Sequence, residues 1–281
     1  MRAQRASKTA QGVALLRAIE SARPLEKRLV NDPYARKMVN SVNLACSTAW
    51  VKAGLYDLSW KGAYEYVIAR ERYIDDMLRQ ALQEGFKQIV ILGAGFDMRA
   101  FRIEGMERVV VFEVDHPATQ AAKRDKLRKL FDPIRENIRF VSIDFNEQTL
   151  EERLSASGYD EFEKTFFIWQ GVTMYLTPQG VDATLKFIAE HSKSGSKVVF
   201  DYFTSSLMHR SLSIQFARIF LNMIGESLDF SIEDGQLEAF LNARGFEQVT
   251  DANWETLTRL YFTGTGKTVA KGIAIGSGTV K

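Results

Sequence analysis

The spacing of hydrophobic positions changes about a third of the way along the chain. In the first third, apolar residues recur every three or four positions, as in Val67, Ile74 and Leu78, and this spacing predicts amphipathic helices. The expected helices cover residues 10–22, 32–39 and 64–84. The first part of the molecule is therefore predicted to be helical.

Beyond residue 87, short runs of β-branched and aromatic residues replace this pattern. They predict strands at residues 88–92, 108–115, 138–144, 165–170, 197–201, 246–250 and 257–262. Helical stretches separate most of them, at residues 118–130, 179–192 and 235–243. Strands that alternate with helices predict βαβ units, and so an α/β fold with a doubly wound, mostly parallel sheet of seven strands.

The chain contains no repeat of fixed period and no low-complexity linker, which favours one domain over residues 1–281. Within it we expect an N-terminal helical lid at residues 1–86 and a ligand-binding core at 87–203. A cap would be inserted at 204–232, with an amphipathic helix over 205–224. The end of the core would follow at 233–263, and a tail at 264–281, rich in glycine and threonine, is expected to fray.

Composition narrows the class of protein. The 281 residues include 37 basic and 35 acidic ones, a net charge of +2, and no basic patch of the kind that binds nucleic acid. Cys46 is the single cysteine, and the apolar residues around it predict a buried thiol in a protein without a disulfide framework. No apolar run reaches membrane-spanning length, so we expect a cytoplasmic protein that acts on small molecules.

Ligand contacts in a doubly wound sheet come from the carboxyl ends of strands. The first candidate is the turn LGAGFD at residues 92–97, where Gly93 and Gly95 let the backbone approach a ligand closely. Met98 occupies the place of the third glycine in a dinucleotide fingerprint, which argues against a pyrophosphate site. A purely structural turn is the alternative.

Acids end the next two strands. Asp115 lies about 20 residues beyond the glycine turn, where a carboxylate can accept hydrogen bonds from both hydroxyls of a ribose. An N-cap before Pro117 is its alternative role. Asp144 and Phe145 follow the third strand, where an acid can accept from an adenine amino group and a ring can pack on the base. The alternative is a simple turn acid.

Arg70 on the long helix is a fourth candidate, because a guanidinium can bind the carboxylate of an amino acid with two hydrogen bonds. A solvated surface arginine is the alternative. A ribose acceptor, an adenine acceptor and a carboxylate ligand together match S-adenosylmethionine better than a nicotinamide dinucleotide. A nicotinamide-dependent oxidoreductase therefore stays a second hypothesis.

The sequence also resembles the leucine carboxyl methyltransferase family, in particular its bacterial S-adenosyl-L-methionine-dependent O-methyltransferase branch. The resemblance extends from Thr9 to about Phe262. It rests on six blocks: NDPYA at 31–35, ARERYIDD at 69–76, LGAGFDMR at 92–99, FEVDHP at 112–117, GVTMYL at 171–176 and FLNARGF at 240–246. It implies a class I methyltransferase (Rossmann-like) fold with S-adenosyl-L-methionine as the cofactor.

The resemblance implies the same roles for Arg70, the two glycines, Asp115, Asp144 and Phe145 as the residue types suggest. It also implies that the hydroxyl of Tyr175 orients the acceptor, while a half-buried core tyrosine is the alternative. Gln170 departs from the family, which usually has glutamate before Gly-Val. Its amide can still accept from the cofactor's ammonium but without the charge, so Gln170→Glu would be expected to tighten binding.

The supply of catalytic bases is small. Only His116, His191 and His209 carry an imidazole, and none shows the spacing of a metal site. A carboxylate acceptor needs no base, whereas a hydroxyl needs one, and His209 in the predicted cap is then the candidate. We therefore expect methyl transfer to a carboxylate or hydroxyl of a small molecule. A protein that binds the cofactor without catalysis is a further hypothesis, and the oligomeric state stays open.

Overall fold

The fold is taken from a computed structural model, which describes residues 8–54, 61–144, 148–210 and 228–281. A sheet of seven strands forms its centre, in the order β3-β2-β1-β4-β5-β7-β6. Neighbouring strands from β3 to β5 are parallel, and β7 runs antiparallel to both β5 and β6. The strands are β1 Gln88–Leu92, β2 Val110–Asp115, β3 Ile138–Ser142, β4 Thr165–Trp169, β5 Lys197–Phe203, β6 Phe246–Ala252 and β7 Ile273–Val280.

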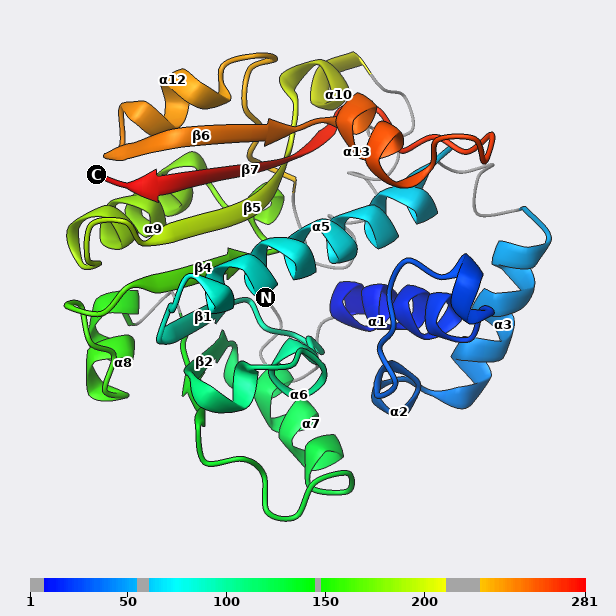
Figure 1. Cartoon of the computed structure of the whole chain (residues 1–281), viewed down its shortest axis with the longest axis horizontal. Coiled ribbons are helices and arrows are strands. Elements are labelled where there is room, and N and C mark those ends of the chain that lie inside the picture. Colours follow the sequence, from blue (N-terminus) through cyan, green and yellow to red (C-terminus); the bar gives the residue numbers. More distant parts are fainter. Residues whose placement is uncertain (1–7, 55–60, 145–147, 211–227) are drawn as a thin grey trace.

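Helices cover both faces of this sheet (Figure 1). The α-helices are α1 Lys8–Ser21, α2 Ala35–Met38, α3 Ser41–Lys52, α5 Ala63–Gln83, α6 Arg99–Arg102, α7 Pro117–Leu127, α8 Leu150–Ala156, α9 Pro178–Glu190, α10 Ser205–Arg210, α12 Leu237–Asn242 and α13 Trp254–Tyr261. Short 3₁₀ turns are η1 Leu25–Lys27, η2 Met106–Arg108 and η3 Thr173–Tyr175. The predicted α/β class with a mostly parallel sheet of seven strands is confirmed.

Alternation along the strands produces two cores, one on each face. In β1, Ile89 and Ile91 belong to one cluster, while Val90 and Leu92 belong to the other, which includes apolar residues of α8, α9 and α12. Strands β1 and β4 are buried along their whole length, which explains why they read as nearly uninterrupted apolar runs.

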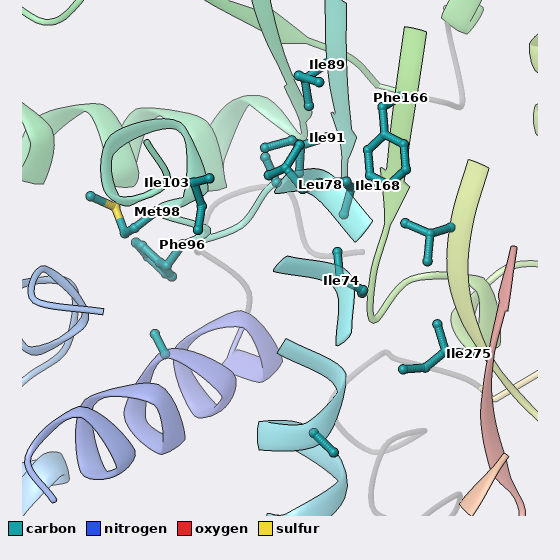
Figure 2. Packing of buried hydrophobic residues seen from close by; sticks show 14 of the residues in the cluster. Ile74, Leu78, Ile89, Ile91, Phe96, Met98, Ile103, Phe166, Ile168 and Ile275 are labelled. Carbon is teal, nitrogen blue, oxygen red and sulfur yellow. The ribbon is translucent and has the colours of Figure 1, made fainter. Parts of the chain in front are cut away.

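Helix α5 crosses the first of these faces. Figure 2 shows Ile74 and Leu78 of α5 beside Ile89 and Ile91 of β1 and Ile168 of β4. The helices α1 to α3 lie instead beyond the carboxyl ends of the parallel strands (Figure 1). The N-terminal region therefore supplies both a layer of the core, through α5, and a cover over the edge where a ligand is expected, through α1 to α3.

Two predictions for the last quarter of the chain are wrong. A strand was expected at residues 257–262, but residues 254–261 form helix α13. This helix begins where the side chain of Asn253 accepts a hydrogen bond from the amide of Thr256 over 3.0 Å. The tail does not fray, because residues 273–280 form β7 between β5 and β6. Gly276 is needed there, since a Cβ atom would lie 2.9 Å from Cδ2 of Leu237 in α12.

The region around Cys46 also differs from the prediction. Cys46 is exposed, and α3, which carries it, has no buried residue. Trp50 of the same helix is 59% exposed. The apolar residues at 44–50 therefore mark a helix on the surface of the N-terminal cover and not a part of the core. Within the described ranges, no helix combines the length and the apolar character that crossing a bilayer requires.

Candidate functional site

Strands β1 and β4 are neighbours in the sheet. From β1 the chain adds β2 and β3 on one side, whereas from β4 it adds β5 on the other side, so the strand order reverses between β1 and β4. Ligands of doubly wound folds bind at this switch point, outside the carboxyl ends of the strands. The segments that follow β1, β2, β4 and β5 therefore define the candidate site.

The glycine turn after β1 has the backbone that only glycine adopts easily. Gly93 and Gly95 have φ angles of 65° and 46°. A Cβ atom at Gly93 would lie 2.4 Å from Cγ2 of Val172, and one at Gly95 would lie 3.0 Å from Cβ of Ala10. The turn is thus in close contact with the segment after β4 and with α1.

The carboxylate of Asp115 is tied to this turn. It accepts hydrogen bonds from the amide of Gly95 over 2.5 Å and from the amide of His116 over 2.6 Å. Burial raises the pKa of Asp115 above its ordinary value, although both amides favour the charged form. The N-cap of α7 is His116, whose Nδ1 accepts from the amide of Ala118 over 3.2 Å, so the alternative role considered for Asp115 is wrong.

Asp144 lies beyond the same edge of the sheet, two residues after β3. The register pairs Asp115 with Ser142, so Asp144 follows the strand next to Asp115. Its backbone amide donates to Oε1 of Gln148 over 3.2 Å. Phe145 lies outside the described residues.

Arg70 is buried rather than solvated, with 4% of its surface exposed. Its Nη1 donates to Oδ2 of Asp201, its guanidinium carbon lies 5.4 Å from the ring centre of Tyr66, and a Cβ atom at Gly171 would lie 3.5 Å from Nη1. Burial opposes the charge on Arg70, but Asp201, together with Tyr66 and Glu71, outweighs this effect and raises the pKa above its ordinary value. Among the described residues, Nε of Arg70 has no hydrogen-bond partner although it is buried.

Asp201 is one residue of this site that the sequence interpretation missed. It is fully buried in β5, and its Oδ1 accepts from the amide of Gly171 over 2.5 Å, while Oδ2 accepts from the hydroxyl of Tyr66 over 3.0 Å. Its backbone oxygen accepts from the hydroxyl of Thr173. An acid at the end of the apolar run KVVFD was the only signal in the sequence.

Gln170 follows β4 directly. Its Nε2 donates to Oε1 of Glu71 over 2.7 Å. Its Oε1 is buried, and no hydrogen-bond partner for it exists among the described residues. A buried acceptor without a donor is rare in proteins, because it costs about 1–3 kcal/mol.

A buried network of ion pairs surrounds Glu71. Arg99 bonds Oε2 of Glu71 over 2.9 Å and Oδ1 of Asp75 over 2.7 Å, and it also pairs with Asp97 of the glycine turn. Arg17 of α1 donates to Asp32 over 3.0 Å and to the backbone oxygen of Phe96 over 2.5 Å. This network, which the sequence did not reveal, joins α1, α5 and the glycine turn.

The remaining candidates lie around this centre. Tyr175 ends the turn η3 and is half-buried, packed against the core on the α5 side of the sheet. His191 precedes β5 and so lies at the opposite edge of the sheet, with its ring stacked 5.3 Å from that of Phe187. The side chain of His209 and residues 211–224 of the expected cap helix lie outside the described residues.

The structure therefore brings most of the predicted residues together. Asp115 contacts Gly95, Gly93 closely approaches Val172, and Gly171 closely approaches Arg70. These contacts form one continuous path along the carboxyl ends of β2, β1 and β4. The glycine backbone offers a close approach to a ligand. Oε1 of Gln170 and Nε of Arg70, for which the described part of the chain supplies no hydrogen-bond partner, offer an acceptor and a donor. These groups fit the amino-acid end of S-adenosylmethionine.

Comparison with known proteins identifies the class of this α/β protein. A relative from Mycobacterium avium, named "Putative S-adenosyl-L-methionine-dependent methyltransferase", is 30% identical over 253 residues, covering 85% of this chain and 82% of the relative. A relative of the same name from Mycobacteroides abscessus is 31% identical over 267 residues, covering 90% and 87%. The crystal structure of a "putative methyltransferase" from Thermobifida fusca matches with a TM-score of 0.63 at 14% identity, covering 100% and 96%.

The family model described as leucine carboxyl methyltransferase matches residues 10–189. The chain belongs to this family. The prediction of an S-adenosylmethionine-dependent methyltransferase with the class I methyltransferase fold is confirmed at this level. The nicotinamide-dependent alternative is set aside.

Proposed function

We propose that this protein transfers a methyl group from S-adenosylmethionine to an oxygen atom of a small-molecule acceptor, with a carboxylate favoured over a hydroxyl. The cofactor supplies a methyl group that is already activated as part of a sulfonium. The protein then has to align the acceptor with the methyl group and exclude water. Alignment of this kind can lower the activation barrier by up to ~7–11 kcal/mol.

In this proposal, the amino-acid end of the cofactor lies between Arg70 and Gln170. Arg70 binds the carboxylate, since its guanidinium is fixed by Asp201 and retains a buried Nε without a partner among the described residues. Gln170 accepts a hydrogen bond from the ammonium. The backbone of Gly93 and Gly95 lies under the cofactor, because no side chain intervenes there.

Residues at the carboxyl ends of β2 and β3 would hold the nucleoside end. Asp115 binds the ribose hydroxyls, because each of its oxygens retains a lone pair beyond the one used by a backbone amide. Asp144 and Phe145 bind the adenine. Tyr175 orients the acceptor with its hydroxyl, from the turn that follows β4.

The preference for a carboxylate is carried by the positions of the described histidines. Nδ1 of His116 caps α7 at the nucleoside end, and His191 lies at the opposite edge of the sheet. A carboxylate is ionised at neutral pH because its unperturbed pKa is about 4, so it needs no base, whereas a phenol with a pKa of about 10 would need one. The family name, leucine carboxyl methyltransferase, also supports a carboxylate.

A radiolabel experiment separates the acceptors. The protein is incubated with methyl-labelled S-adenosylmethionine and a small-molecule extract, and the product is treated with mild alkali, which releases methanol from methyl esters and not from ethers. His209→Ala is expected to be nearly neutral with a carboxylate and to lose about a hundredfold or more with a hydroxyl. Alkali-stable product with an inactive His209→Ala variant would overturn the carboxylate preference. Product methylated on nitrogen or carbon would overturn oxygen transfer, and no turnover would favour the non-catalytic hypothesis.

A further inference from the structure

Glu71 and Gln170 form a pair with a fixed orientation. Nε2 of Gln170 donates to Oε1 of Glu71 over 2.7 Å. A carboxylate can only accept, so the contact decides which end of the amide faces Glu71 and turns Oε1 of Gln170 away from it. We propose that Glu71 is a positioning residue, which orients Gln170 so that its oxygen accepts from the ammonium of the cofactor. This inference rests on the cofactor roles proposed above.

The carboxylate of Glu71 is itself held in place. It is 1% exposed, its Oε2 accepts from Arg99 over 2.9 Å, and Nη1 of Arg17 lies 3.5 Å from its Oε1. Burial opposes ionisation, but the charges of Arg99 and Arg17 outweigh it and lower the pKa of Glu71 to about 2. Glu71 is therefore an anion near neutral pH, and it keeps the amide of Gln170 in one of its two orientations.

The oxygen end of the Gln170 amide can accept a hydrogen bond from a ligand. Oε1 of Gln170 is buried, and among the described residues it has no partner. Arg70, one residue before Glu71 on α5, lies next to Gly171, one residue after Gln170. An acceptor for an ammonium and a guanidinium for a carboxylate thus come from adjacent positions of the same two segments, as recognition of an α-amino acid requires.

This pair explains how the chain can function without the glutamate that its family usually has at position 170. A carboxylate at that position would lie against Glu71 in a buried site, where like charges disfavour each other's ionisation. The resemblance alone predicts that Gln170→Glu tightens cofactor binding, whereas the contact predicts that it weakens binding. Exchange of both residues at once would restore a matched pair, with the amide at 71 and the carboxylate at 170.

Calorimetry with two ligands tests the proposal. S-adenosylhomocysteine carries the α-amino group, and 5′-methylthioadenosine has the same nucleoside without the amino-acid end. Gln170→Glu and Glu71→Gln are each expected to weaken binding of S-adenosylhomocysteine by about fivefold or more, while methylthioadenosine stays within about twofold. The double variant E71Q/Q170E is expected to return to within about threefold of the wild type.

Gln80→Glu is the matched control, because Nε2 of Gln80 donates to Glu84 over 2.8 Å on the exposed side of the same helix. This variant is expected to leave binding of both ligands unchanged. Should Glu71→Gln fail to fold, Gln170→Glu decides alone, since Gln170 is not a member of the arginine network. Unchanged or tighter binding of S-adenosylhomocysteine by Gln170→Glu, or equal losses for both ligands, would overturn the proposal. A wild-type protein that binds neither ligand would overturn the cofactor roles as well.

Discussion

The carboxylate of Asp115 is bound to the glycine turn, and we propose that it also binds the ribose. Its two oxygens accept hydrogen bonds from the amides of Gly95 and His116, so the contact with Gly95 fixes the carboxylate relative to the glycine turn. Asp115→Ala is expected to weaken binding of S-adenosylhomocysteine by about 1–3 kcal/mol, the usual loss for a buried hydrogen-bonded charge. Asp144→Ala is expected to weaken it by a similar amount through the adenine.

Calorimetry measures both losses. Asp125→Ala is the control, because Asp125 is an exposed acid that pairs with Arg128 three residues further along the chain and lies outside the proposed site. If Asp115→Ala and Asp144→Ala bind like the wild type, the roles assigned to these acids are wrong.

Gly93 shows the cost of a single methyl group. Gly93→Ala would place its Cβ 2.4 Å from Val172, in a backbone conformation that alanine disfavours. Gly85 has φ of 84° with nothing within 4 Å of its Cβ position, so Gly85→Ala carries the backbone strain without the clash. We expect Gly93→Ala to lower the free energy of unfolding by about 1–3 kcal/mol more than Gly85→Ala, measured by denaturant titration. Partial recovery in the double variant G93A/V172A would identify the clash as the cause. Equal losses at the two glycines would contradict it.

At the scale of the elements, the sequence predicts strands that a local pattern marks and misses those that depend on contacts between distant parts of the chain. Six of the seven strands were recognised because each contains a short run with β-branched or aromatic residues. Strand β7 was missed because glycines such as Gly276 and Gly278 are typical of a loop. Glycine is required at these positions because Leu237 and Phe246 approach the strand closely. Most of helix α13 was taken for a strand because the six residues 257–262 are too few to show a helical period.

The candidate site follows the same rule. Gly93, Gly95 and Asp115 were recognised because each follows directly from the end of a strand. Asp201 was missed, as was Glu71, because their partners Arg70 and Gln170 are 131 and 99 residues away along the chain. The spacing within a helix or strand carries no information on such contacts.

Arg17 is the buried side chain that joins α1 to the glycine turn. Arg17 donates to Asp32 and to the backbone oxygen of Phe96, and its loss would leave these acceptors unpaired in the interior. Arg17→Met is expected to reduce the free energy of unfolding by about 3–5 kcal/mol, the cost of removing one partner of a buried ion pair. Arg79→Met, at an exposed arginine that pairs with the exposed acid Asp76, is expected to cost about 1 kcal/mol or less.

Denaturant titration gives both values, and hydrogen exchange localises the effect. Loss of amide protection in α1 ahead of the sheet would show that Arg17 holds the N-terminal cover on the glycine turn. Equal costs for the two arginine variants would contradict a special role for Arg17.

At the scale of the whole molecule, the buried network of ion pairs makes the free energy of unfolding depend on pH. The pKa of Glu71 is lowered from its ordinary value to about 2 in the folded protein. A group with a lowered pKa stabilises the fold fully at pH values above its unfolded pKa of about 4.3, and this contribution, about 3 kcal/mol, is lost as the pH falls through about 2. Burial raises the pKa of Glu113 and of Asp115, so these two groups act in the opposite direction.

The contribution of Glu71 to stability is therefore obtained as the difference between the wild type and a variant without its charge. The free energy of unfolding of the wild type and of Glu71→Gln is compared between pH 7 and pH 2, with both proteins titrated with denaturant at each pH. At pH 7 the wild type is expected to be the more stable, and the gap is expected to shrink steadily below pH 4, because protonated Glu71 in the wild type then resembles the neutral amide of the variant. Burial opposes the charge of Asp97, but Arg99 and Arg17 outweigh it and hold the pKa of Asp97 well below its usual range, so Asp97 stays charged over most of this pH range. A gap that stays constant down to pH 2 would mean that the charge of Glu71 does not stabilise the folded state, and that the arginines around it are balanced by Asp75, Asp97 and Asp32 alone.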